Sequence, residues 1–237
     1  MGKVLVIPDV HLKPWIFEQA DEIMVNTDCE RAVCVGDLVD DWKCQGDVDL
    51  YEETLESAIR FAKKYPSTLW CYGNHDLAYL WDQYDHPGYS IMAADMVCDM
   101  FEELRDSLES PDNLAIIHKL DNTLFSHAGL SYEFVENQLY NEMDDLEEVI
   151  ESVNGYGVDV LWEVNSPIWV RPQYGNLAKG MYPKDLFQVV GHTPVSEVLE
   201  QDNIITVDTF STSSDGRYIG NREFCWVDTV TKEWGYI

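Results

Sequence analysis

Several features that define large classes of proteins are missing from this sequence. It has no run of about 18 consecutive apolar residues, so no transmembrane helix is expected. Residues 2–7 lead directly into a predicted strand, without the long apolar region and the small-residue cleavage site of a signal peptide. The six cysteines include no C-x-x-C pair. We therefore expect reduced core cysteines in a cytoplasmic protein.

Basic residues are also scarce. The chain has 15 lysines and arginines against 44 aspartates and glutamates, which gives a formal net charge of -29. Such a charge repels nucleic acids and anionic membrane surfaces, so we expect neither stable nucleic-acid binding nor membrane association. A function that handles phosphate would need local positive charge, and bound metal ions are the most direct supplier.

The composition is that of a folded protein. Of the 237 residues, 46% are hydrophobic and 12% are aromatic, which suffices for a substantial core. No internal repeat, low-complexity linker or clear domain boundary interrupts the chain. We therefore expect a single domain over residues 1–237.

Apolar runs and helical spacing alternate in the first third of the chain. Residues 3–8, 31–35 and 67–72 are apolar runs typical of strands that are buried on both faces. Residues 17–26 and 49–64 have the apolar spacing of helices. This β-α-β-α-β order predicts a parallel sheet with right-handed crossovers.

The rest of the chain mixes helices with short strands. We expect helices over residues 91–108 and 132–153, with a β-hairpin between them formed by residues 114–120 and 123–126. A strand over residues 187–190 follows. The last part should contain short antiparallel strands over residues 203–208, 217–219, 223–227 and 232–236.

Polar residues gather directly after the predicted strands, where ligand sites of α/β sheets cluster. These clusters supply Asp9, His11, Asp37, Asn74, His75, His127 and His192. Four of the six histidines are among them, whereas His86 and His118 have no such setting. The set suits two divalent ions about 3.5–4 Å apart. Mixed oxygen and imidazole ligands favour manganese, iron or zinc.

The order of these motifs resembles a known family, the calcineurin-like metallophosphoesterases. The resemblance extends from residue 4 to about residue 210, and the motifs that carry it are Asp9-Val10-His11, Gly36-Asp37-Leu38-Val39-Asp40, Gly73-Asn74-His75-Asp76, His127-Ala128-Gly129 and Gly191-His192-Thr193. Within the superfamily, the second motif and residues 125–130 are most similar to the phosphoprotein (serine/threonine) phosphatase branch.

The resemblance implies a fold and a metal site. The fold would be α/β, a four-layer αββα sandwich of two mixed β-sheets flanked by helices. The ligands of one metal ion would be Asp9, His11 and Asp37. Asp37 would bridge to a second ion, whose other ligands would be Asn74, His127 and His192. Manganese is the ion that we expect first, with iron or zinc as alternatives.

The resemblance also implies a reaction. A metal-bound hydroxide would attack phosphorus, and His75, oriented by Asp40, would protonate the leaving oxygen. Asp208 matches a position at which a carboxylate orients a ligand histidine.

Two residues depart from the pattern of the phosphatase branch. Asp41 stands where that branch usually has an arginine that binds phosphate, and a carboxylate there would repel the substrate. Arg171 is the remaining candidate for a phosphate clamp, together with Asn74 and His75. The second departure is Asp76, where protein phosphatases often have glutamate; the bacterial diadenosine tetraphosphate hydrolases are similar here.

The sequence is compatible with three functions. The first is a phosphomonoesterase similar to the serine/threonine protein phosphatases, acting on a phosphoprotein or a small phosphoester. The second is hydrolysis of a nucleotide anhydride, as in diadenosine tetraphosphate hydrolases, or of a phosphodiester. The third is a binding scaffold of the same fold without catalysis. The matched ligand positions and His75 argue against the scaffold, because loss of catalysis shows first as substitution at such positions.

Overall fold

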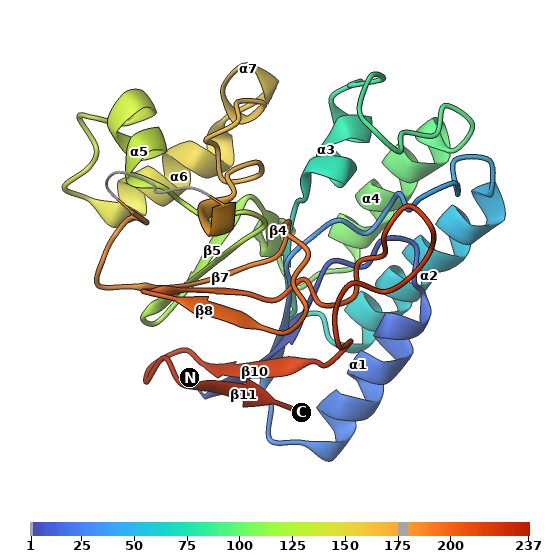
Figure 1. Cartoon of the computed structure of the whole chain (residues 1–237), viewed down its shortest axis with the longest axis horizontal. Helices are drawn as coiled ribbons and strands as arrows, with labels where there is room; N and C mark the ends of the chain where they lie inside the picture. The colour runs from blue at the N-terminus through green and yellow to red at the C-terminus, as the bar shows by residue number, and fades with distance from the viewer. Residues whose placement is uncertain (1, 175–179) are drawn as a thin grey trace.

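Two β-sheets pack face to face in this protein, and helices cover the outer face of each sheet (Figure 1). The computed structural model describes residues 2–174 and 180–237, so that residues 1 and 175–179 of the expected single domain lie outside it. The four layers confirm the predicted αββα sandwich of two mixed sheets. No helix within the described ranges is long and apolar enough to cross a membrane.

The first sheet contains the strands that were predicted in the first third of the chain. Its six strands are β1 (Lys3–Ile7), β2 (Arg31–Cys34), β3 (Leu69–Cys71), β4 (Leu114–Ala115), β10 (Cys225–Asp228) and β11 (Trp234–Tyr236). Their order is β11-β10-β1-β2-β3-β4. Strands β1 to β3 are parallel, as predicted, β4 adds a further parallel strand beside β3, and β10 and β11 add antiparallel strands beyond β1.

The second sheet has five strands: β5 (Ile117–Leu120), β6 (Thr123–Ser126), β7 (Phe187–Val190), β8 (Leu199–Gln201) and β9 (Ile204–Thr206). Their order is β5-β6-β7-β9-β8. The predicted hairpin is the antiparallel pair β5–β6, and β7 lies parallel to both β6 and β9.

The helices form two groups on opposite sides of the sandwich (Figure 1). The first group packs on the first sheet and comprises α1 (Trp15–Asn26), α2 (Val48–Lys64) and α4 (Ala94–Asp106). The second group packs on the second sheet and comprises α5 (Tyr132–Gln138), α6 (Leu146–Gly155) and α7 (Val158–Leu161). Between them, α3 (Asn74–Leu80) begins three residues after β3 ends, and two short 3-10 helices cover Pro111–Asn113 and Pro172–Tyr174.

Strand β1 shows why its sequence is apolar without alternation. Val4 and Val6 face the second sheet, where they belong to the same apolar cluster as Phe125 of β6. Leu5 and Ile7 point the other way and join the cluster formed with the first group of helices. Both faces of the strand are therefore buried between layers, and a polar residue on either face would lose its hydration.

The prediction of one continuous helix over residues 132–153 is wrong, because the structure has two helices there. Helix α5 ends at Gln138 and α6 starts at Leu146. The carboxylate of Asp145 caps α6, because it accepts hydrogen bonds from the N–H groups of Glu147 (3.0 Å) and Glu148 (3.3 Å). This side chain satisfies two N–H groups that a continuous helix would pair internally.

Two strand predictions also need correction. Residues 114–120 are not one strand, because β4 pairs with β3 of the first sheet and β5 pairs with β6 of the second. The chain thus passes between the sheets at Ile116. Residues 217–219 form no strand, and Tyr218 makes only an isolated bridge with Thr212. Strand β8 was not predicted.

Candidate metal centre

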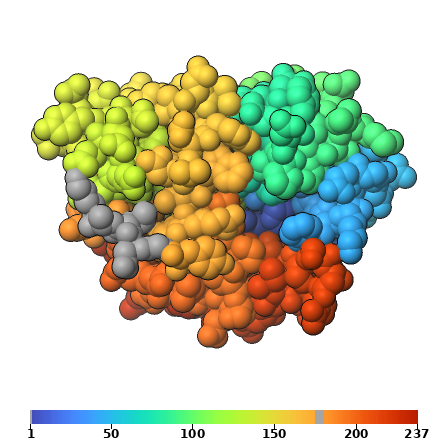
Figure 2. All heavy atoms as spheres, turned by 45° about the horizontal axis from the view of Figure 1, so that its top comes forward, coloured from blue at the N-terminus to red at the C-terminus, as the bar shows by residue number. Residues whose placement is uncertain are grey.

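The candidate ligands gather where strands of both sheets end. Asp9 follows β1, Asp37 follows β2, and Asn74 begins the helix after β3. His127 and His192 follow β6 and β7 of the facing sheet. Figure 2 shows a hollow at this place, with the N-terminal part of the chain, in dark blue, at its floor between teal, light blue and orange segments. The hollow is a cavity of about 420 Å³, lined by His11, Asp37, Asn74, His75 and His192 among others.

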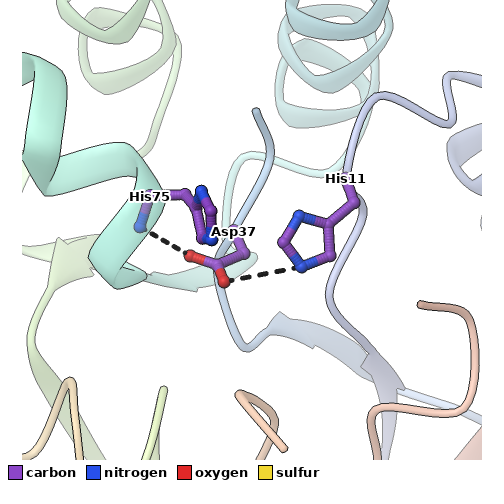
Figure 3. A group of neighbouring side chains, drawn as sticks. All are labelled: His11, Asp37 and His75. Carbon is purple, nitrogen blue, oxygen red and sulfur yellow. Dashed lines mark hydrogen bonds and ion pairs between the residues drawn. The ribbon is translucent and has the colours of Figure 1, made fainter. Parts of the chain in front are cut away.

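Asp37 lies at the middle of this cluster (Figure 3). Its Oδ2 atom is 3.6 Å from His11 Nε2 and 3.3 Å from His127 Nε2, and its Oδ1 atom accepts the N–H of His75 at 3.0 Å. Burial alone would raise the pKa of Asp37, but the charges of His127 and His75 outweigh it and hold the pKa well below the usual range. Asp37 is therefore an anion between two groups of histidines, the position required of a bridging ligand.

Three histidines present an unprotonated nitrogen to the cluster when they are neutral. His11 Nδ1 lies 2.8 Å from Asp40 O, His127 Nδ1 lies 2.9 Å from Val35 O, and His192 Nε2 lies 3.1 Å from Trp169 O. A carbonyl oxygen can only accept, so each of these ring nitrogens carries the proton. The other nitrogen of each ring then offers a lone pair to the interior of the cluster, as metal-ligating histidines do.

These lone pairs lie close to other acceptors. His127 Nε2 is 3.0 Å from the Oδ1 atom of Asn74 and 3.1 Å from His192 Nδ1. Acceptors at such distances repel one another unless a cation or a proton lies among them. His11, Asp37 and His75 form one group whose ligand atoms lie within 4.8 Å of one another, and Asp37, His127 and His192 form another. The donor set therefore fits two divalent cations that share Asp37.

Asp9 has an oxygen atom without a partner. Its side chain is 0% exposed, and its Oδ2 atom accepts the N–H of His192 at 2.8 Å. The Oδ1 atom has no hydrogen-bond partner among the described residues. Burial raises the pKa of Asp9, and so do the charges of Asp208 and Asp37. A cation beside Oδ1 would remove this penalty, which again fits a metal ligand.

His75 and Asp40 form a pair at the edge of the cluster. His75 Nδ1 lies 2.9 Å from Asp40 Oδ2, and Asp40 Oδ1 accepts hydrogen bonds from the hydroxyls of Tyr51 (2.7 Å) and Tyr79 (2.6 Å). Burial acts to lower the pKa of His75, but the charges of Asp37 and Asp40 and the bond to Asp40 raise it overall. His75 can therefore hold a proton. The two tyrosines were not found from the sequence, because their helical positions carry no site signal.

His86 belongs to the site although its sequence setting did not indicate it. Its Nε2 atom lies 2.9 Å from the Nδ2 atom of Asn74. An amide nitrogen only donates, so His86 Nε2 accepts. Burial, together with the charge of His75, lowers the pKa of His86 to about 4, and the ring is neutral near neutral pH. His86 thereby holds the Asn74 amide with its oxygen toward His127. It lies in the loop after α3, away from any strand end.

The carboxylate of Asp41 is not free to repel a substrate. Its Oδ2 atom lies 2.9 Å from the Nζ atom of Lys13, and its Oδ1 atom accepts the hydroxyl of Thr212 at 2.6 Å. Lys13 is only 5% exposed and also donates to the carbonyl oxygen of His11. The ion pair neutralises the charge that seemed unfavourable in the sequence, and Lys13 was missed because it follows the first motif without belonging to it.

Arg171 and Asp208 both line the cavity. Arg171 Nη1 donates to the carbonyl oxygen of His192 (2.9 Å) and to Thr193 Oγ1 (3.1 Å), so its guanidinium is held beside the cluster. Asp208 accepts hydrogen bonds from the N–H and the hydroxyl of Ser211. In the described part of the chain, backbone carbonyls rather than Asp208 hold the rings of the three candidate histidines.

A family model decides which family carries this site. The model of the calcineurin-like phosphoesterases matches residues 2–225. The chain belongs to this family. Calcineurin-like phosphoesterases hydrolyse phosphoesters with divalent metals, and the clustered aspartates and histidines are the groups that would hold them here. No curated protein matches the chain.

A comparison with solved structures finds one neighbour with the same fold, at low identity, and further neighbours with lower TM-scores. The cold-active protein-tyrosine phosphatase of a psychrophilic Shewanella species is 18% identical with a TM-score of 0.58, over 100% of this chain and 80% of that one. A protein serine/threonine phosphatase from Saccharomyces cerevisiae is 13% identical with a TM-score of 0.49, over 95% and 72% of the two chains. A metallophosphoesterase from Sphaerobacter thermophilus has the same identity and TM-score over 99% and 86%.

Proposed function

We propose that this calcineurin-like phosphoesterase is a phosphomonoesterase that depends on two divalent metal ions. The observation that carries the proposal is the His75–Asp40 pair beside the cluster of inward lone pairs. Asp9, His11 and Asp37 would hold one ion, and Asn74, His127 and His192, with Asp37 as the bridge, would hold the other. When bound, such ions activate a water molecule and neutralise the charge of a phosphate.

The residues of the chain would then have separate tasks. Asp40 holds His75 Nδ1, which leaves Nε2 to give a proton to the leaving oxygen. Arg171, whose guanidinium is held beside His192, would bind the phosphate together with Asn74 and His75. Asp208 would act on the centre through its charge beside Asp9.

The charge of the cavity supports a monoester over a nucleotide anhydride. Among the described residues that line it, Arg171 is the only lysine or arginine. Lys13 is engaged by Asp41 and does not line the cavity. A dinucleotide tetraphosphate would bring several further phosphates into this space, and each would need a cation. A single phosphate above the metal centre does not have that requirement.

We further infer manganese as the working metal and the cytoplasm as the compartment. Carboxylate, amide and imidazole ligands together suit manganese, although iron or zinc can use the same set. All six cysteines are free, which is the state that a reducing compartment maintains. A substrate could be a phosphoprotein or a small phosphoester, whereas the net charge of -29 disfavours nucleic acid.

The first experiment is manganese-dependent hydrolysis of p-nitrophenyl phosphate by the wild type and by His75→Asn. We expect turnover by the wild type and a loss of about 10²-fold or more in kcat for the variant, as removal of a general acid gives. Metal content should be the same in both proteins, because His75 is not proposed as a ligand.

Two outcomes would contradict the proposal. A wild type that retains manganese but cleaves only dinucleotide polyphosphates or diesters would replace the monoesterase by those activities. A protein that binds less than about one equivalent of metal after manganese loading would be a scaffold of the family without the catalytic centre.

A further inference from the structure

Apolar side chains contribute to the lining of the cavity that also contains the proposed proton donor. Trp42, Pro87, Pro194 and Ile219 contribute to it. Gly88, which follows Pro87, packs on Asp40: a Cβ atom placed on Gly88 would lie 3.0 Å from Asp40 Cβ. Asp40 also holds the His75 ring, so Gly88 and its neighbour Pro87 lie near the residue from which a proton would reach the leaving oxygen. The group attached to that oxygen would therefore lie in this cavity among its apolar lining residues.

Trp42 is held in place although it is exposed. Trp42 is 56% exposed, yet its indole Nε1 donates a hydrogen bond to the carbonyl oxygen of Thr212 at 2.8 Å. Asp41 contacts both residues of this bond, because its Oδ1 atom accepts hydrogen bonds from the hydroxyl of Thr212 at 2.6 Å and from the backbone N–H of Trp42 at 2.7 Å. An aromatic ring whose orientation is already restricted loses little entropy when a ligand packs on it.

The charge near Trp42 favours a neutral group. Asp41 is paired with Lys13, so the residue that precedes Trp42 presents no free carboxylate. No lysine or arginine of the described part of the chain lines the cavity except Arg171, which is held beside His192. A second anionic group on the substrate would find no cationic partner among the apolar lining residues, whereas a flat neutral ring could pack against indole and proline.

We propose that Trp42, with Pro87 and Ile219, forms a subsite for the aromatic ring of an aryl phosphate monoester. This inference rests on the proposed phosphomonoesterase function and names its substrate class. In the reaction, the bond between phosphorus and the phenolic oxygen breaks and a bond to the oxygen of water forms. The proton from His75 goes to the phenolic oxygen, so the products are a phenol and inorganic phosphate. Phosphotyrosine side chains and small phenyl phosphates share this chemistry.

The test compares aryl and alkyl substrates in the manganese-loaded wild type, Trp42→Ala and Trp42→Phe. We expect Trp42→Ala to raise KM for phosphotyrosine about 10-fold, as loss of one aromatic contact gives. KM for glycerol 2-phosphate should change by less than about twofold, because no ring is bound. Trp42→Phe keeps a ring and should keep most of the preference. Equal changes of KM for both substrates, or none, would overturn the inference.

A binding measurement separates this inference from the proposed function. Phenylphosphonate and methylphosphonate cannot be hydrolysed, and calorimetry on the metal-loaded protein gives their affinities directly. Tighter binding of phenylphosphonate that is lost in Trp42→Ala supports the subsite even if no monoester is turned over. Turnover of monoesters with equal affinity for both phosphonates keeps the proposed function and removes the subsite.

A third comparison identifies the source of the ring. A phosphotyrosyl peptide with kcat/KM at least about tenfold above phenyl phosphate would assign the subsite to a protein side chain, because flanking residues then add binding energy. Equal values would assign it to a free aryl ester. Both results support the subsite, provided that each activity falls in Trp42→Ala.

Discussion

Two glycines stand directly against carboxylates of the metal centre. A Cβ atom at Gly73 would lie 2.0 Å from Asp37 Oδ1, and one at Gly191 would lie 1.8 Å from Asp9 Oδ1. The φ angle of Gly73 is -91°, which any residue adopts, so a side chain there is excluded by the carboxylate rather than by the backbone. Both positions thus keep space for a ligand oxygen.

We predict that Gly73→Ala loses metal together with activity. The added methyl group displaces Asp37, the residue that both ions would share, and a displacement of about 1 Å can lower activity about 10²-fold. The metal content of the purified variant and its hydrolysis of p-nitrophenyl phosphate check this. Gly155→Ala is the matched control, because a Cβ atom there meets nothing within 4 Å. Normal manganese content in Gly73→Ala would show that Asp37 is not a ligand.

A second residue-scale prediction concerns His86. His86→Phe keeps an aromatic ring but removes the acceptor for the Asn74 amide, so that the amide can rotate and turn its nitrogen toward the metal. We expect manganese affinity or kcat to fall about 10-fold to 100-fold, as for other groups that orient metal ligands. His86→Gln offers an acceptor again and should recover part of the loss. If His86→Phe equals the wild type in a manganese titration, another group orients Asn74.

Which site residues the sequence could reveal depends on where they lie. Asp37 and His127 were predictable because each follows a strand, and strand ends of facing sheets meet. His86 and Lys13 were not, because neither lies at a strand end and their proximity to the centre arises only when loops pack. The neutralised charge of Asp41 was hidden for the same reason, since its partner is 28 positions away.

At the scale of elements, one capping side chain marks the start of α6 after the break that follows α5. We predict that Asp145→Ala lowers the free energy of unfolding by about 1 kcal/mol, the usual cost of losing an N-cap aspartate. Urea unfolding measures this difference. Asp144→Ala removes the same charge from the neighbouring exposed residue and should change stability by less than about 0.5 kcal/mol. A larger loss in Asp144→Ala than in Asp145→Ala would contradict the assigned cap.

The same region shows the limit of periodicity as a guide to elements. Residues 139–145 contain neither proline nor glycine, so nothing in their composition indicated a break. Leu139 is nevertheless buried, and with φ -134° and ψ 30° it leaves the helical conformation at the end of α5. The prediction joined β4 and β5 into one strand because the apolar residues 114–120 give no indication of where the chain passes from one sheet to the other. By contrast, β1, β2 and β3 were predictable from apolar runs and the turns that bound them.

At the scale of the whole molecule, His118 connects the two sheets. It lies on β5 and is 8% exposed, and its Nε2 atom lies 2.9 Å from the carbonyl oxygen of Trp70 on β3. Burial lowers the pKa of His118 to about 4 in the folded protein, against 6.5 for the free side chain. Between these values the unfolded chain binds a proton that the folded chain does not. The contribution of neutral His118 to the free energy of unfolding is therefore complete above pH 6.5, and it is lost as the pH falls from 6.5 toward about 4.

We predict that His118→Gln flattens this part of the pH dependence. Glutamine can still donate an N–H to Trp70 but does not titrate. The free energy of unfolding of the wild type should fall by up to about 1.4 kcal/mol per pH unit relative to the variant over this range. Urea unfolding of both proteins at a series of pH values, in chelator, gives the comparison. Parallel curves for the two proteins would mean that His118 is protonated in the fold.

The prediction of the overall architecture rested on the order of the motifs rather than on any single predicted helix or strand. The motifs indicated the sandwich through resemblance, while composition indicated only a folded chain with a large core. The packing of the sheets, in which His118 reaches across to Trp70, could not be derived from either strand alone because it joins residues 48 positions apart.

The hydrogen bond between the His192 N–H and Asp9 joins residues 183 positions apart. The ends of β1 and β7 must therefore meet before the centre has all of its proposed ligands. A chain that is still being synthesised on the ribosome cannot bring these ends together until β7 has emerged. Chains that end before His192 thus lack one of the proposed ligands, and on the proposed mechanism they would not hydrolyse phosphoesters even without a separate inhibitor.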